Sequence, residues 1–187
     1  MNSRELMERL ELSPIIAAVH EHDFEAAIAS PVEVIFCLKT SILTVAEHVK
    51  TAHEAGKCIL VHIDLAEGVG RDRAGIEYLA SLGVDGIIST RTQLCRYARE
   101  RGIIAVQRFF ALDSQGLESI SENLENSAPD LVEIMPGVIG KAISRFSGGK
   151  TPVIAGGLIE TKKEVLAALE CGALAVSTGK QELWYID

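Results

Sequence analysis

The stretch PVIAGGLI at residues 152–159 decides the fold of this chain, together with a second stretch, ALAVSTGK, at residues 173–180. Each is a short apolar run that ends in small residues, where a helix can begin. Glycine lets the backbone approach a ligand closely, and the free N–H groups at the start of a helix attract an anion. Two such turns after the last two strands of an eight-stranded barrel would form its phosphate site. The next question is whether the remaining sequence predicts such a barrel.

Strand-like and helix-like segments alternate along the whole chain. The strand-like runs are residues 15–19, 32–38, 58–63, 84–89, 103–109, 131–135, 153–155 and 174–177. Helical spacing is found at residues 41–55, 73–82, 93–101, 114–125, 140–146 and 161–171, and Gly56, Gly83, Gly102 and Gly172 fit C-terminal helix caps. Nearly continuous apolarity is typical of parallel strands that are covered on both faces. The pattern predicts an α/β fold, a compact (β/α)8 TIM-type barrel with short loops that forms one domain over residues 1–187. A doubly wound open sheet is the alternative.

Composition narrows the class of protein. The chain has 187 residues, of which 48% are hydrophobic, and it contains no run of 18 apolar residues, so we expect a globular protein without a membrane-spanning segment. The N-terminus is polar, which argues against a signal peptide. The four cysteines lie far apart, so we expect reduced thiols, no metal site and a cytoplasmic location. The net charge of −8 argues against broad nucleic-acid binding, although it permits a local basic patch.

Polar residues follow most of the predicted strands, at the end where barrels of this kind carry their functional sites. These residues are Lys39, His62, Asp64, Ser89, Thr90, Arg91, Gln107, Arg108, Glu133, Gly156, Gly157, Ser177 and Thr178. Polar side chains at the ends of apolar strands predict a ligand pocket.

Most of these positions also have a structural interpretation. His62 and Asp64 are two residues apart and therefore predicted on one side of a strand, where they either bind a polyol, act as an acid–base pair or fill the barrel mouth. Ser89 and Thr90 either face a ligand or cap the next helix, and Arg91 binds either a phosphate or an acidic residue. Arg108 lies in an apolar run, where an ion pair with Glu133 is at least as good an interpretation as an anion site.

Six stretches of the chain resemble one known family. They are SPIIAAV at 13–19, LVHIDL at 60–65, DGIISTR at 85–91, AVQRFFALDS at 105–114, DLVEIMPG at 130–137 and PVIAGGLI at 152–159. The chain resembles, nearly from end to end, the glycerol-3-phosphate-responsive antiterminators that regulate glycerol uptake operons.

The resemblance implies a barrel without enzymatic activity or a cofactor. Such a protein senses glycerol 3-phosphate and binds an mRNA leader, where it prevents premature termination of transcription. On this interpretation Gly156, Gly157, Ser177 and Thr178 hold the phosphate, and His62, Asp64, Arg108 and Glu133 contact the glycerol part or shape the pocket. Ser89 and Arg91 are further candidates for ligand contact, and Lys39 is either a phosphate contact or part of a salt bridge.

The RNA surface is not located by the resemblance. Arg96, Arg99 and Arg101 lie within two turns of one predicted helix and are candidates for it, with a solvated helix face as the alternative. Two other functions stay open. One is a phosphosugar or phosphopolyol isomerase or lyase that uses His62, Asp64 and Glu133; the other is a ligand-binding protein that has lost RNA binding. A homo-oligomer is one of the assembly states that the sequence leaves open.

Overall fold

Eight parallel strands pair in chain order and close into a barrel, because β8 pairs with β1. The computed structural model describes residues 1–186, apart from the side chains of Ser114, Ser119 and Glu125. The strands are β1 (Ile15–Val19), β2 (Val34–Cys37), β3 (Cys58–His62), β4 (Gly86–Ser89), β5 (Ile104–Phe110), β6 (Leu131–Met135), β7 (Val153–Gly156) and β8 (Ala175–Thr178). The predicted (β/α)8 barrel is confirmed, and the open sheet is excluded by the closing pair.

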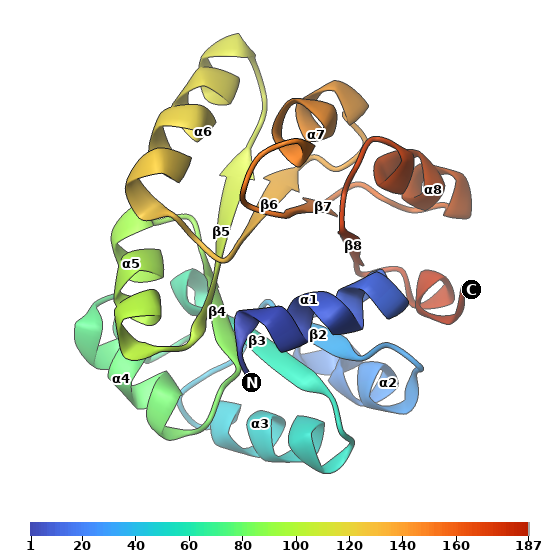
Figure 1. Cartoon of the computed structure of the whole chain (residues 1–187). Helices are drawn as coiled ribbons and strands as arrows, with labels where there is room; N and C mark the ends of the chain where they lie inside the picture. Colours follow the sequence, from blue (N-terminus) through green and yellow to red (C-terminus); the bar gives the residue numbers. More distant parts are fainter. Residues whose placement is uncertain (187) are drawn as a thin grey trace.

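Helices surround the barrel and alternate with its strands (Figure 1). They are α2 (Phe24–Ala29), α3 (Val45–Glu54), α4 (Arg73–Ser81), α5 (Thr92–Arg101), α6 (Ser114–Ser127), α7 (Gly140–Ser147) and α8 (Lys162–Glu170). Short 3-10 turns follow three of the strands: η1 (Glu21–Asp23), η2 (Ile63–Leu65) and η3 (Gln181–Tyr185). Among the described residues, no helix has both the length and the apolar character needed to cross a membrane.

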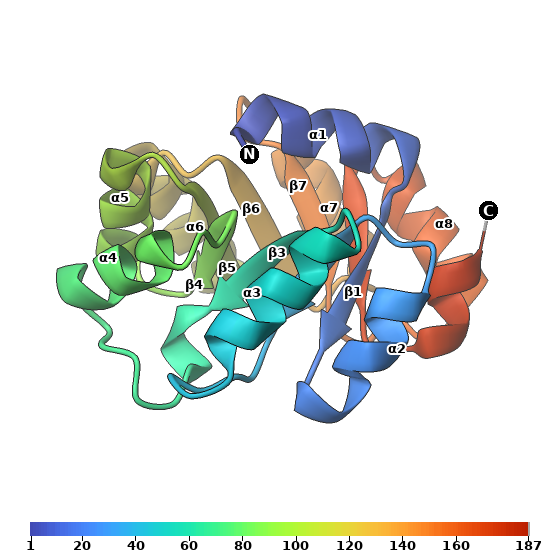
Figure 2. The same cartoon turned by 90° about the horizontal axis from the view of Figure 1, so that it is seen from below.

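An additional helix, α1 (Ser3–Leu12), precedes the first strand and lies across the end of the barrel where the strands begin (Figures 1 and 2). Asn2 and Glu5 form a reciprocal capping box at its start, which satisfies two backbone N–H groups. Leu6 and Leu10, one turn apart, are fully buried against side chains of the barrel interior. Helix α1 therefore closes the N-terminal mouth.

The strands contribute to two separate apolar layers because their side chains alternate in direction. Phe36, Leu60 and Ile88 point inward and pack with α1, whereas Ile35, Val61 and Ile87 point outward and pack beneath the surrounding helices. Burial on both sides explains why the strands read as continuous apolar runs.

Most predicted boundaries agree with the structure to within two residues, but α3 begins later than predicted, and neither α1 nor α2 was predicted as a helix. Helix α3 begins at Val45 instead of residue 41, because Ser41 forms an isolated bridge with Glu67 and the chain turns before the helix. Residues 24–29 form α2, where no helix was predicted. The four glycines predicted to end helices all have positive φ, which confirms their role as C-terminal caps.

Candidate functional site

A pocket of about 260 Å³ opens at the carboxyl ends of the strands, between the loops that follow β1, β7 and β8. Its lining consists of Ala18, His20, Asp23, Leu38, Arg108, Glu133, Met135, Gly157, Leu158, Ile159, Ser177, Thr178 and Gly179. The pocket thus combines small and apolar residues with a few convergent polar groups, as ligand sites usually do. It contains five of the residues predicted to contact a ligand: Arg108, Glu133, Gly157, Ser177 and Thr178.

A buried ion pair forms the floor of this pocket. Arg108 Nε donates to Glu133 Oε2 at 2.5 Å, and Ser177 Oγ donates to Glu133 Oε1 at 2.6 Å. The side chains of Arg108 and Glu133 are only 8% and 1% exposed. They meet because the register of β5 and β6 places the two residues side by side. The predicted Arg108–Glu133 ion pair is therefore confirmed, and the terminal nitrogens of Arg108 remain as donors for a ligand.

Gly156 provides the space in which Glu133 reaches across β7 to β8. A Cβ atom at this position would collide with Glu133 Oε1 and would lie 2.7 Å from Ser177 Oγ. The glycine is required by the contact between these two side chains, a reason that the sequence did not reveal.

The turn after β7 places backbone groups at the pocket. Gly157 and Leu158 both have positive φ, at 76° and 59°. The N–H of Gly137 donates to the carbonyl groups of Gly156 and Gly157, at 2.5 and 3.1 Å, which fixes this turn against the loop after β6. Gly157, Leu158 and Gly179 line the pocket, so backbone groups border it as well as side chains.

The start of helix α8 does not supply the anion site that the sequence suggested. The helix begins at Lys162, beyond the glycine turn, and its first turn is closed by a capping box between Thr161 and Glu164. Glu164 Oε2 accepts from the backbone N–H groups of Glu160 and Thr161, each at 2.9 Å. A carboxylate thus occupies the positive end of this helix.

Thr178 joins two of the loops around the pocket. Its hydroxyl donates to the carbonyl of Ile159 at 2.9 Å and accepts from the backbone N–H of Lys180 at 3.1 Å. The side chain of Thr178 is therefore engaged within the protein, and so is the hydroxyl of Ser177, which donates to Glu133.

The prediction that His62 and Asp64 lie on the same side of a strand is wrong. Strand β3 ends at His62, and residues 63–65 turn into η2, so Asp64 points toward the end of β4. There Asp64 accepts hydrogen bonds from Ser89 Oγ at 2.9 Å, from the N–H of Thr90 at 2.7 Å and from Thr90 Oγ1 at 3.0 Å. Arg91 Nε lies 3.7 Å from the same carboxylate. Asp64, Ser89 and Arg91 thus clamp two strand ends together and do not line the pocket.

His62 lies inside the barrel, with 4% of its surface exposed, and its Nδ1 has no hydrogen-bond partner among the described residues. Burial, reinforced by the nearby Arg108 guanidinium, lowers the pKa of His62 to about 4. The imidazole is therefore neutral at pH 7.

The low pKa of His62 makes stability depend on pH. An unfolded histidine titrates near pH 6.5, so between pH 6.5 and 4 the unfolded chain binds more protons than the folded chain. The free energy of unfolding is expected to fall by about 2 kcal/mol between pH 7 and pH 5 through this group alone. Urea unfolding at both pH values measures the free energy of unfolding that each protein loses between pH 7 and pH 5. The loss in His62→Leu should be smaller than the loss in the wild type by about 2 kcal/mol. Equal losses in the two proteins would contradict the prediction.

Lys39 forms an ion pair with Glu67, with Nζ and Oε1 3.7 Å apart, so the salt-bridge interpretation of this residue is confirmed. More than half of its side chain is exposed, and it lies outside the pocket lining described above.

The three arginines of α5 do not form one basic face. Arg96 pairs with Glu100 on its own helix, Arg101 pairs with Glu77 on α4, and Arg99 pairs with Asp130 before β6. Each cation points toward a different carboxylate, which weakens the helix as a candidate RNA surface.

His20 and Asp23 line the pocket but were missed in the sequence. They belong to the polar run that directly follows β1, and the same strand-end rule that selected the other candidates would have found them. Gln181 Nε2 donates to Asp23 Oδ1 at 2.9 Å, which ties the loop after β1 to η3.

Within the described part of the chain, no three His, Cys, Asp or Glu side chains gather closely enough to hold a metal ion.

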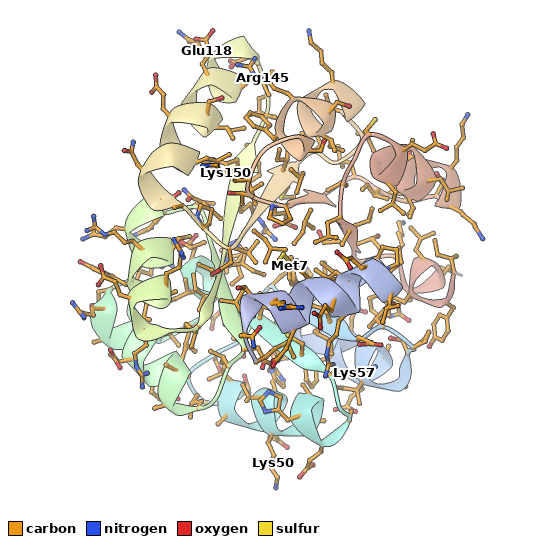
Figure 3. All side chains as sticks on the ribbon, viewed as in Figure 1. Met7, Lys50, Lys57, Glu118, Arg145 and Lys150 are labelled. Atoms are coloured by element: carbon orange, nitrogen blue, oxygen red, sulfur yellow. The ribbon has the colours of Figure 1, made fainter. Side chains whose placement is uncertain are left out.

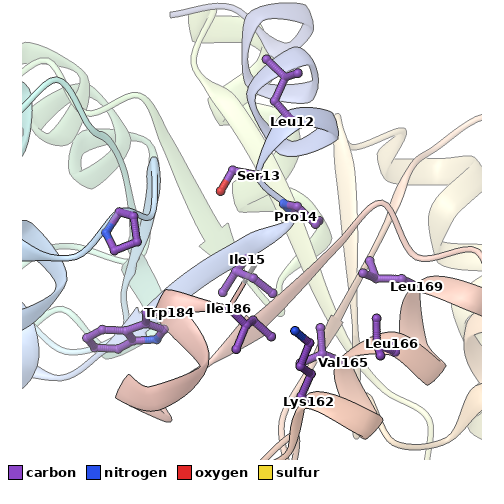
Figure 4. A pocket seen from close by; sticks show the side chains of 11 residues that line it. Leu12, Ser13, Pro14, Ile15, Lys162, Val165, Leu166, Leu169, Trp184 and Ile186 are labelled. Carbon is purple, nitrogen blue, oxygen red and sulfur yellow. The ribbon is translucent and has the colours of Figure 1, made fainter.

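A second hollow, of about 240 Å³, lies outside the barrel between the start of β1, helix α8 and the C-terminal segment (Figure 4). Its lining is mainly apolar, with Pro14, Leu166 and Trp184 among its residues. It lies away from the polar strand ends and lacks their convergent hydrogen-bonding groups.

Comparison with known proteins gives a consistent family match. A family model described as glycerol-3-phosphate responsive antiterminator matches residues 15–184. An uncharacterised protein of Escherichia coli K12, YgcP, is 33% identical over 96% of this chain and 95% of its own length. The crystal structure of a glycerol uptake operon antiterminator regulatory protein from Listeria monocytogenes is 34% identical, with a TM-score of 0.88 over 92% of this chain and 95% of that one.

Enzymes share only the fold. N-acetylmannosamine-6-phosphate 2-epimerase from Clostridium perfringens is similar with a TM-score of 0.71, over 92% of this chain and 88% of the epimerase chain. Its sequence identity is 16%, so the likeness concerns the barrel and not the chemistry of the site.

Proposed function

The chain belongs to the glycerol-3-phosphate responsive antiterminator family, and we propose that it senses glycerol 3-phosphate in the pocket at the carboxyl ends of its strands. The family is regulatory, and the proposal includes binding of an mRNA leader, antitermination and the absence of catalysis. The observation that carries the proposal is the Arg108–Glu133–Ser177 cluster beneath the glycine turn.

The chemistry of the pocket suits a small polyol phosphate. In this proposal the amides of Gly157, Leu158 and Gly179, which line the pocket, donate to the phosphate, and the terminal nitrogens of Arg108 add positive charge. The carboxylates of Glu133 and Asp23 accept hydrogen bonds from hydroxyl groups and disfavour a second anionic group. Ligand binding is thus divided between a donor-rich side and an acceptor-rich side.

An enzymatic role has less support from the same geometry. Asp64 is held at the end of β4 by three hydrogen bonds, so it does not join His62 and Glu133 in one site. No lysine is found among the described residues that line the pocket, and a lyase of the Schiff-base type needs such an amine. We therefore favour a sensor over an isomerase or lyase.

Calorimetric titration tests the effector. The protein should bind glycerol 3-phosphate selectively, with glycerol and inorganic phosphate each at least tenfold weaker because each satisfies only one side of the pocket. Mass analysis of the recovered ligand should show that it is unchanged. An absence of binding, or equal affinity for inorganic phosphate, would overturn the proposed effector.

A further inference from the structure

One continuous segment of this acidic protein carries no acidic residue. The chain has 26 aspartates and glutamates in 187 residues, about one in seven, yet none occurs from Ile134 to Ile159. The segment covers the end of β6, all of α7 and β7, and the glycine turn at the pocket. It contains three cations, Lys141, Arg145 and Lys150.

These three cations differ from most others in the described structure. Eleven lysine and arginine side chains lie within 4 Å of a carboxylate: Arg4, Arg9, Lys39, Lys50, Arg73, Arg91, Arg96, Arg99, Arg101, Arg108 and Lys180. Lys57 instead donates to the backbone carbonyl groups of Ser30 and Val32. By contrast, no carboxylate among the described side chains pairs with Lys141, Arg145 or Lys150. Among the side chains that the structure describes, none neutralises these three charges through an ion pair.

The three cations run along one side of the barrel. Lys141 and Arg145 are one turn apart on the exposed face of α7, whose other face buries Ala142, Ile143 and Phe146. Arg145 and Lys150 both line a hollow of about 590 Å³ between α6 and α7, and Figure 3 labels both side chains. The guanidinium of Arg145 lies 5.9 Å from the centre of the Phe146 ring, which holds it beside this hollow.

The same segment is joined to the pocket. Met135, Gly157, Leu158 and Ile159 line the pocket, and the loop that leads into α7 is bonded to the glycine turn through the N–H of Gly137. A ligand that contacts this turn and shifts it would therefore also shift the loop that leads into α7, through the hydrogen bonds of the Gly137 N–H.

We propose that RNA binds to the exposed side of α7, with Lys141 and Arg145, together with Lys150 in the loop that follows the helix. The inference rests on the proposed function, and it names a surface different from α5. The cations contact backbone phosphates, and the hollow between α6 and α7 accepts an unstacked base beside the planar guanidinium of Arg145. An effector in the pocket changes RNA affinity through the Gly137 contact.

The RNA used in the test is first selected for binding to the wild-type protein. Hairpin RNAs with a randomised loop are selected against the wild-type protein at saturating glycerol 3-phosphate, and one selected hairpin is used in all assays. The triple variant K141Q, R145Q, K150Q should bind this hairpin at least tenfold more weakly. The slope of log affinity against log salt should fall by about 2 to 3, because three phosphate contacts are lost.

A matched control removes the same charge elsewhere. The variant R4Q, K50Q, R96Q loses three exposed cations that each pair with a glutamate one turn away, on α1, α3 and α5. It should keep the affinity and the salt slope of the wild type. Calorimetry with glycerol 3-phosphate should give equal binding in both variants, which shows that the fold and the pocket are intact.

The outcomes separate the two proposals. If the α7 variant binds the hairpin as the wild type does, or if both variants lose affinity equally, the surface is wrong while RNA binding stands. If selection against the wild type yields no hairpin, RNA binding by this chain is overturned, and the α7 surface with it. Binding of glycerol 3-phosphate is measured separately in each case.

Discussion

Replacement of Glu133 by alanine should lower the free energy of unfolding by about 3–5 kcal/mol, since it leaves the Arg108 guanidinium buried without its partner. Ser177 also loses the acceptor of its hydroxyl. Urea unfolding at pH 7 measures this loss directly, with the slope of the transition compared between the two proteins. The same variant should show no measurable affinity for glycerol 3-phosphate.

Two further variants distinguish the buried pair from ordinary charge loss. Glu67→Ala removes the exposed partner of Lys39 and should change stability by less than about 1 kcal/mol. The double variant R108M, E133L replaces the pair by apolar side chains and should recover most of the stability, yet it should still bind no effector. A loss below about 1 kcal/mol in Glu133→Ala would contradict the central role of the pair.

Gly156→Ala is the second substitution with a large expected effect. Its methyl group would occupy the space through which Glu133 reaches Ser177, so either the carboxylate or strand β7 must move. Overpacking of this kind typically costs about 1–3 kcal/mol, and displacement of Glu133 should weaken effector binding at least tenfold. Urea unfolding and calorimetric titration measure the two effects.

Gly148→Ala is the matched control for this substitution. Gly148 has no atom within 4 Å of the added Cβ position and does not have positive φ, so alanine fits there without strain. Its stability and affinity should equal those of the wild type. If Gly156→Ala behaves like this control, Glu133 has more room than the structure indicates.

The fold was predictable because burial on both faces leaves a direct trace in the sequence. The predicted bounds of strands β3 and β6 lie within one residue of the observed ones, because each strand needs apolar side chains on both faces. Helix α1 was missed although its signals are present: Asn2 with Glu5 forms a capping box, and Leu6 with Leu10 forms one apolar stripe. No strand precedes it, so the alternating pattern that revealed the other helices did not include it.

The site was predictable where strand register alone decides it. Arg108 and Glu133 meet because their strands are neighbours, and that follows from the order of the barrel. Asp64 could not be placed in the same way, since one 3-10 turn after His62 redirects its side chain to the next strand end. The role of Gly156 depends on a contact between strands β6 and β8, which no local pattern contains.

Because helix α1 covers the N-terminal end of the barrel, only the C-terminal end is open. Leu6 and Leu10 fill the N-terminal mouth, so a molecule in the pocket enters and leaves on the opposite side, past the loops that follow β1, β7 and β8. Two of those loops are tied by the hydrogen bond from Gln181 to Asp23, and two by the bond from Thr178 to Ile159. These two hydrogen bonds therefore hold together the rim that any molecule must pass to enter or leave the pocket.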